Sequence, residues 1–157
     1  MISGDIPVWG AYLTGLTVAL QETGTKFNLI FPDDYGIHFY AGSVYATDDF
    51  LATHPDLVTR FLRATLKGWT LAVADPSEAA LLVRKYNPNA DIARELLRLR
   101  ASQPIVNTGE DKIGWMRREV WAGMYEFLTA QHLITANLNV DDLFTDRFVT
   151  EAYKAQP

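Results

Sequence analysis

The residues best suited to bind a ligand lie in the first third of the chain. Trp9 and Tyr12 follow a short apolar run, and Asp34, Tyr35 and His38 follow a second one. Flat aromatic faces with a few polar tips suit a planar or cationic small molecule, because rings stack on rings and attract cations. These residues predict a small-molecule site, although the same rings could instead pack a core between a sheet and its helices.

Two adjacent carboxylates, Asp33 and Asp34, stand beside these aromatic residues. A pair of carboxylates could bind an ammonium group or the edge of an aminopyrimidine. The stretch Pro32-Asp-Asp-Tyr-Gly36 is equally typical of a turn, in which aspartate side chains bond nearby backbone N–H groups. We interpret Asp33 as a turn residue and leave both interpretations open for Asp34.

The sequence carries no signature of catalysis or of a metal centre. It contains none of the patterns G-x-G-x-x-G, G-x-x-x-x-G-K-[ST], G-x-S-x-G and H-E-x-x-H, which mark nucleotide, serine-hydrolase and zinc sites. His38, His54 and His132 lack the i, i+4 spacing that presents two imidazoles from one helix face. Because cysteine is absent, thiolate metal sites and thiol catalysis are excluded. We therefore predict no catalytic residue, no metal site and no cofactor.

Length and charge narrow the class of protein further. The chain has 157 residues, of which 48% are hydrophobic and 21% charged, as expected for one globular domain. Lys and Arg number 14 against 19 Asp and Glu, and the resulting charge of -5 argues against a nucleic-acid partner. No apolar stretch reaches the roughly 20 residues of a membrane span, and residues 1–7 lack the basic and apolar regions of a signal peptide. We expect a soluble protein without membrane insertion, whose export signal was either removed or never present.

The spacing of apolar residues predicts mainly helices in the second half of the chain and strands in the first. The predicted helices cover residues 14–22, 55–74, 78–86, 91–101, 115–128 and a segment within 141–153, with a polar turn at 107–111. The predicted strands cover residues 6–12, 26–31 and 37–47. This order predicts an α/β fold with a short sheet: a single domain, 1–157, with a strand-rich part at 1–47 and a helical part at 48–157.

The block from Thr47 to Ala80 is the most specific stretch of the sequence. It contains Thr47-Asp-Asp-Phe-Leu51, then a proline that opens a helix, and then Asp75-Pro-Ser-Glu-Ala79 at the start of the next helix. Together with Trp9-Gly-Ala-Tyr12 and Asp34-Tyr-Gly36, this block resembles the periplasmic substrate-binding proteins of the thiamine-pyrimidine, sulfonate, taurine and nitrate group. The resemblance covers nearly the whole chain.

The resemblance implies a type II periplasmic-binding fold, in which two α/β lobes close on a solute that an ABC permease then imports. It implies that this chain is the C-terminal part of such a protein, a partial two-lobe fold in the periplasm or outside the cell. Trp9 and Tyr12 would stack on the solute, which would be a thiamine-pyrimidine precursor, a sulfonate or a similar small organic molecule. Tyr35 and His38 would exchange hydrogen bonds with it, Asp34 would hold the turn or meet a cationic group, and no reaction would be catalysed.

Two departures from the group bear on the ligand and on catalysis. Pyrimidine binders carry Asn-Glu where this chain has Gly15-Leu16, which removes the carboxylate expected to meet an aminopyrimidine. The related thiamine-pyrimidine synthases carry a cysteine-rich iron-binding run where this chain has Gly36-Ile-His-Phe-Tyr40. A synthase-like enzyme is therefore the least favoured alternative, and an interaction or sensor module on the same scaffold is the other.

The predicted sheet also suggests self-association. A sheet without neighbouring strands would expose unpaired backbone groups and apolar rows between Ile37 and Tyr45. We therefore expect a homodimer whose interface is built around the segment Phe39–Tyr45 and the helix Leu57–Trp69.

Overall fold

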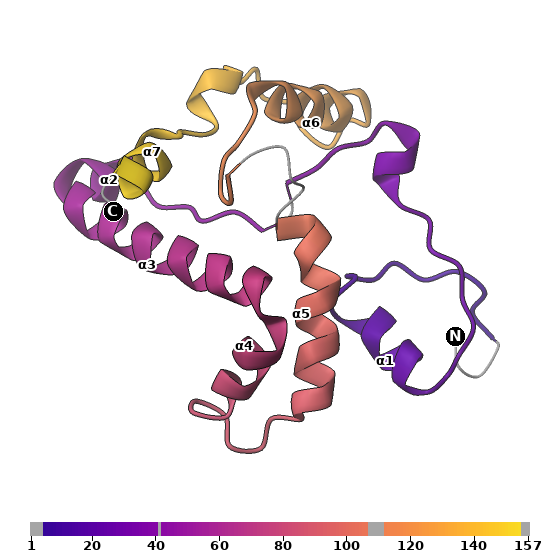
Figure 1. Cartoon of the computed structure of the whole chain (residues 1–157). Coiled ribbons are helices and arrows are strands. Elements are labelled where there is room, and N and C mark those ends of the chain that lie inside the picture. Colours follow the sequence, from indigo (N-terminus) through magenta and orange to yellow (C-terminus); the bar gives the residue numbers. More distant parts are fainter. Residues whose placement is uncertain (1–4, 41, 107–111, 155–157) are drawn as a thin grey trace. The chain divides into compact units, whose positions relative to one another are not determined.

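The computed structural model of the chain describes residues 5–40, 42–106 and 112–154, and all regular structure within these ranges is helical. The elements, with η for short 3-10 helices, are α1 (Leu16–Glu22), η1 (Pro32–Tyr35), α2 (Asp48–Thr53), α3 (Pro55–Ala74), α4 (Pro76–Val83), α5 (Ile92–Val106), α6 (Arg118–Ala130), η2 (Val140–Asp142) and α7 (Arg147–Lys154) (Figure 1). The predicted polar turn at 107–111 lies outside the described residues.

The predicted α/β fold with a short sheet is wrong, since none of the three predicted strands forms in the described part of the chain. An apolar or alternating segment becomes a strand only where a second strand accepts its backbone hydrogen bonds, and this condition is non-local. Residues 37–40 instead lie along a helix, as shown below. The prediction that residues 1–47 are rich in strands is therefore also wrong. That the chain is a single domain stays a prediction.

The predicted helices are largely confirmed. α3 begins at Pro55 and ends at Ala74, as predicted, and α1 ends before Gly24, whose φ of 68° is the left-handed conformation expected after a helix. The predicted end of α5 at residue 101 is wrong, because α5 continues through Pro104 to its last turn. A proline near the end of a helix removes one backbone hydrogen bond, which an exposed last turn can lose to water.

α2 was not predicted, because the third predicted strand ended at residue 47 and no helix was expected before Pro55. The hydroxyl oxygen of Thr47 accepts the backbone N–H of Phe50 at 3.2 Å, and Asp48 and Asp49 occupy the first turn. Both features stabilise a helix start, through a satisfied N–H group and through the helix dipole.

The chain divides into two compact units, and one of the three boundaries between them falls inside α3, between Thr65 and Leu66. Unit 1 comprises residues 1–28 and 66–113, and unit 2 comprises residues 29–65 and 114–157. In unit 1, both α4 and α1 lie against α5 (Figure 1). Glu22 of α1 accepts hydrogen bonds from Nε of Arg94 of α5 at 3.0 Å, so an exposed ion pair accompanies this packing. The buried apolar side chains of unit 1 are Val18, Leu20, Leu66, Ala80 and Ala90.

Unit 2 holds α6 against η2 and buries one face of α7. The ring of Trp121 in α6 stacks on Phe144, with centroids 5.7 Å apart and planes within 6°. Nε of Arg118 donates to the carboxylate of Asp141 at 2.6 Å, which links α6 to η2. The buried apolar side chains of α7 are Phe148, Val149 and Ala152.

Asp75 fixes the start of α4, because its carboxylate accepts the backbone N–H groups of Ser77 and Glu78, both at 3.0 Å. Asp75→Ala removes both bonds and should lower the free energy of unfolding by about 1 kcal/mol. Asp75→Asn keeps an acceptor oxygen and should cost much less. Urea denaturation followed by circular dichroism measures both variants, and equal losses would show that capping is not the role of this side chain.

Candidate functional site

The five predicted ligand-binding residues are divided between the two units. Trp9 and Tyr12 belong to unit 1, where they precede α1 and are 54% and 79% exposed. Asp34 and Tyr35 lie in η1 of unit 2, and both are exposed. His38 follows η1 in the same unit. Three of the five thus share one short segment of unit 2, and the roles of all five stay predictions.

His38 lines a groove in unit 2 between the chain that follows η1 and the helix α6. The groove has a volume of about 490 Å³, which lies within the range of small-molecule sites. Its lining residues are Gly36, Ile37, His38 and Phe39 on one side and Arg117, Glu119, Val120, Gly123 and Phe127 on the other. This His38 groove therefore combines two phenyl rings with an imidazole, a guanidinium group and a carboxylate.

The segment 36–40 is held on α6 by its backbone and by its rings. The backbone N–H of Arg117 donates to the hydroxyl oxygen of Tyr40 at 2.8 Å, and the N–H of Tyr40 donates to Sδ of Met124 at 3.4 Å. The ring of Phe39 meets that of Phe127 edge to face, with centroids 5.5 Å apart. Because these contacts hold the segment on a helix, the segment forms one wall of the groove and is not a strand of a sheet.

The imidazole of His38 is positioned by Asp33, whose carboxylate lies 2.6 Å from Nδ1 of the ring. Gly36 makes this approach possible, because its φ of 76° is a left-handed conformation that closes the turn between the two residues. The backbone N–H of Gly36 donates to the carbonyl oxygen of Asp33 at 3.0 Å. Asp33 is thus the turn residue that we predicted, and its side chain also orients His38. With Nδ1 engaged, Nε2 is the ring nitrogen that can meet a ligand.

The charges around the groove come mainly from the start of α6. Arg117 and Glu119 place opposite charges on its lining. The adjacent Arg118 donates to Asp141, and this hydrogen bond holds the pKa of the Asp141 carboxyl below its usual value. In this groove a planar ring can stack against Phe39 or Phe127 while the polar lining groups bind the edge of the ring.

Of the residues that line the groove, the sequence predicted a ligand-binding role for His38 and for none on the α6 side. The predicted helix 115–128 contained Arg117, Glu119 and Phe127, but no motif marked any of them as a ligand-binding residue. These residues lie near His38 only because the segment 36–40 contacts α6 in the folded chain. About eighty positions separate them from His38 in the sequence, so no local sequence pattern predicts that they lie together. The hydrogen bond from Tyr40 to Met124 spans 84 positions.

The described residues contain no group of three or more His, Cys, Asp or Glu side chains that could hold a metal ion. In the same ranges, no helix combines the length and the apolar character needed to cross a membrane. The absence of a cofactor stays a prediction.

Comparison with known proteins identifies the family. Residues 1–79, half of the 157-residue chain, match the NMT1/THI5-like family, and the chain belongs to it. The chain is also 28% identical over 155 residues to the riboflavin-binding protein RibY of Chloroflexus aurantiacus, which covers 95% of this chain and 44% of that protein. The resemblance to substrate-binding proteins is confirmed, and the matches indicate a ligand-binding protein. The chain spans less than half the length of this relative.

Asp146, just before α7, carries a half-buried carboxylate that predicts a pH-dependent stability. Its Oδ1 has no hydrogen-bond partner among the described residues, and burial raises the pKa of this carboxyl. A raised pKa favours the protonated form in the folded protein, so this contribution to stability is present at acidic pH and lost as the pH rises through the raised pKa.

We expect Asp146→Asn, which stays uncharged, to be more stable relative to the original protein at pH about 7 than at pH about 3. Melting temperatures at both pH values measure this difference. Asp142→Asn, at an exposed position of η2, removes the same charge and serves as the matched control. A difference that is the same at both pH values would contradict the prediction.

Proposed function

We propose that this chain binds a small organic molecule, either a planar heterocycle or a small sulfonate, as the solute-binding component of an ABC-type importer. The observation that carries this proposal is the His38 groove, where an oriented imidazole lies beside two phenyl rings in a cavity of suitable volume. Membership of the NMT1/THI5-like family supports it. The relative from Chloroflexus aurantiacus is named for riboflavin, a planar heterocycle, and this supports a ring-shaped ligand here as well.

The ligand remains within the chemistry of planar heterocycles and small sulfonates. An aminopyrimidine precursor is the weaker choice, because Gly15 and Leu16 stand where pyrimidine binders carry Asn-Glu. The His38 ring offers a donor or an acceptor to the edge of a heterocycle. Riboflavin and the thiamine pyrimidine are therefore the first probes, with taurine as the sulfonate.

Binding can be measured by the change in riboflavin fluorescence on titration with the chain. Replacing Phe127 by Leu keeps an apolar side chain but removes its ring, and should weaken binding about fivefold, since one stacking contact contributes about 1 kcal/mol. His38→Ala should weaken binding by a similar factor. Tyr86→Ala is the control, because this ring is 91% exposed in unit 1 and lines neither wall. No response to riboflavin, the pyrimidine or taurine would contradict the proposed function.

The remaining predicted residues are tested in the same assay. We propose that Trp9 and Tyr12 stack on the ligand, that Tyr35 donates or accepts a hydrogen bond, and that Asp34 meets a cationic group or holds its turn. The double variant Trp9→Ala/Tyr35→Ala should bind more weakly than Tyr86→Ala. Equal affinities of the two variants would show that Trp9 and Tyr35 do not contact the ligand. The His38 groove alone would then be the proposed binding site.

We further propose that the ligand is bound without being transformed, and that an ABC permease receives it in the periplasm or outside the cell. The relative from Chloroflexus aurantiacus is named as a binding protein, which supports this role. The competing hypothesis of a synthase-like enzyme requires pyridoxal phosphate and iron. Mixing the protein with both and observing a Schiff-base absorbance or a pyrimidine product would contradict the proposal.

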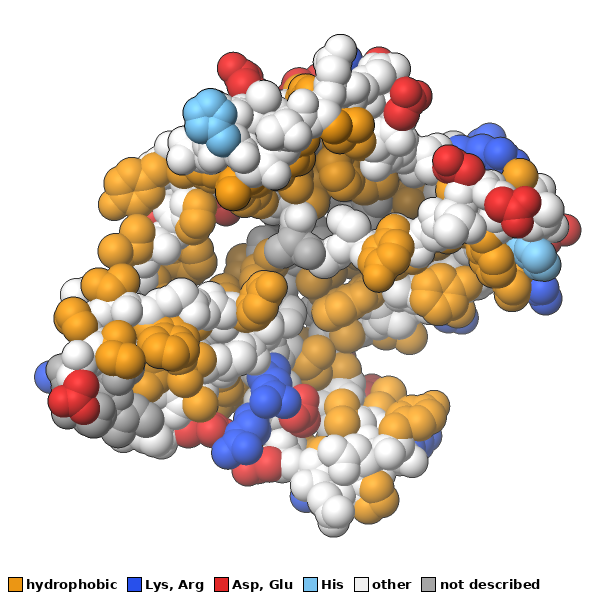
Figure 2. All heavy atoms as spheres, turned by 180° about the vertical axis from the view of Figure 1, so that it is seen from behind, with side chains coloured by type: hydrophobic (Ala, Val, Ile, Leu, Met, Phe, Trp, Pro, Cys, Tyr) orange, Lys and Arg blue, Asp and Glu red, His pale blue; other side chains and the backbone are white. Residues whose placement is uncertain are grey.

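We also propose that the chain forms a homodimer. The sheet edge that first suggested one is absent from the described residues, but apolar side chains of the same region remain exposed. Val44 and Tyr45 are 62% and 94% exposed, and Leu57 and Phe61 of α3 are also exposed. Figure 2 likewise shows hydrophobic side chains on the surface. A second copy would remove such groups from water.

Analytical ultracentrifugation tests the homodimer. The original chain should sediment as a dimer at high concentration, whereas Tyr45→Asp/Phe61→Asp should remain a monomer, because a dimer would have to bury the new charges. Leu81→Asp is the control, since it places a charge on an exposed apolar position of unit 1. A compact monomer of the original chain at every concentration would contradict the proposal.

A further inference from the structure

The face of α6 that lines the His38 groove carries a row of three residues spaced four positions apart. Glu119, Gly123 and Phe127 all line the groove. Positions four apart follow one another along the same face of a helix, so the row has a carboxylate at one end, bare backbone in the middle and a phenyl ring at the other end. The rise of an α-helix places its two end residues roughly 12 Å apart along the axis.

Gly123 is the least expected member of this row. Glycine inside a helix is destabilising relative to alanine, because it loses more conformational freedom on folding. Packing does not require glycine here, since a Cβ atom at this position would meet no described atom within 4 Å. The backbone does not require it either, because Gly123 lies within α6 and is not among the residues with a positive φ. Gly123 therefore leaves open a part of the groove that the described chain does not fill.

The carboxylate of Glu119 can accept hydrogen bonds from a ligand. Glu119 is exposed, and no residue in the described ranges donates a hydrogen bond to it. Arg118 interacts with it electrostatically, but the Arg118 guanidinium donates to Asp141. Because an ionised carboxylate is only an acceptor, a ligand that binds it must carry an N–H or O–H donor.

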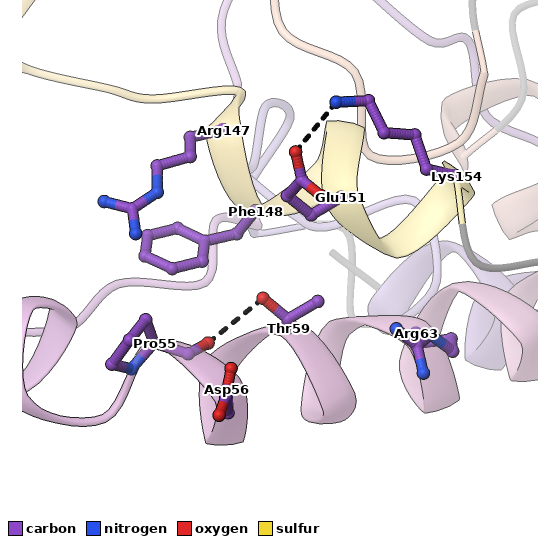
Figure 3. A pocket seen from close by; sticks show the side chains of 8 residues that line it. All are labelled: Pro55, Asp56, Thr59, Arg63, Arg147, Phe148, Glu151 and Lys154. Atoms are coloured by element: carbon purple, nitrogen blue, oxygen red, sulfur yellow. Dashed lines mark hydrogen bonds and ion pairs between the residues drawn. The ribbon is translucent and has the colours of Figure 1, made fainter.

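The second cavity of unit 2 lies between α3 and α7 and lacks this combination (Figure 3). No glycine is found among the described residues that line it. On its α7 side, Nζ of Lys154 donates to the carboxylate of Glu151 at 2.8 Å. Of these two cavities, the His38 groove is thus the one that joins an open helix surface to a carboxylate without a hydrogen-bond donor.

We propose that the ligand of the His38 groove is a fused planar heterocycle with an N–H donor at one end, which lies over Gly123 and contacts both Phe127 and Glu119. This inference rests on the proposed function and narrows its class of ligand. Two or three fused rings are needed because a single ring is too short to reach both ends of the row. A small sulfonate is disfavoured, since it has no ring to cover Gly123 or to stack on Phe127.

Two matched probes test the contact with Glu119. Riboflavin has three fused rings with an N–H group at one end, and in 3-methylriboflavin a methyl group replaces that hydrogen. The original chain should bind riboflavin about fivefold more tightly in a fluorescence titration, because a hydrogen bond to a charged acceptor is lost with the methylated probe. Glu119→Gln should bind riboflavin more weakly and distinguish the probes less. Glu126→Gln, on α6 but outside the lining, removes the same charge and should distinguish them like the original protein.

Gly123→Ala separates a ligand role from a structural one, because its two expected effects are opposite. The added methyl group should raise the melting temperature, since alanine favours a helix. It should also weaken riboflavin binding about fivefold or more, because it occupies space that the ring needs. Gly68→Ala is the matched control: Gly68 lies in α3, would also meet no atom within 4 Å, and lines neither cavity. This variant should raise the melting temperature and leave binding unchanged.

The possible outcomes distinguish this inference from the proposed function. The inference is overturned if Gly123→Ala binds riboflavin as tightly as Gly68→Ala, or if Glu119→Gln distinguishes the two probes as well as Glu126→Gln does. Binding of taurine or the thiamine pyrimidine without binding of riboflavin would also overturn it, while leaving the proposed function intact. A chain that binds none of these probes would contradict the proposed function, and this inference with it.

Discussion

The hydrogen bond between the backbone of Arg117 and the hydroxyl of Tyr40 is the contact on which the His38 groove depends. Arg117 precedes the first turn of α6, where backbone N–H groups have no partner within the helix, and Tyr40 supplies the acceptor from far along the chain. This bond holds the segment 36–40 against α6, together with the edge-to-face contact of Phe39 with Phe127. The Tyr40 hydroxyl thus provides a hydrogen-bond acceptor for a backbone N–H at the start of α6, and it also holds one wall of the groove in place.

The sequence predicted the helices well because their signals are local. Pro55 and the Asp75-Pro76 pair mark the ends of α3 and the start of α4, and each acts through its own neighbours in the chain. The strands were predicted wrongly because the apolar and aromatic residues of 37–47 specify burial but not the partner that provides it. The candidate site shows the same limit. His38 was found from its residue type and its aromatic neighbours, whereas Phe127 and Arg117 could not be, since only the folded chain brings them near.

The family match and the groove overlap only in part. All five residues predicted from the sequence lie within 1–79, the stretch that matches the family. One wall of the His38 groove comes from that stretch, while the wall on α6 lies beyond it.

Gly36 constrains how this groove can change over evolutionary time. A side chain at this position would meet no atom within 4 Å, so space does not exclude one. The backbone does, because a φ of 76° is strained for residues with a Cβ atom. Drift away from glycine would relax the turn and move His38 away from Asp33 without altering either phenyl ring. A homologue could thus lose the oriented imidazole by a single substitution and keep an intact apolar groove, and a survey of related sequences at this position would separate the two kinds of binder.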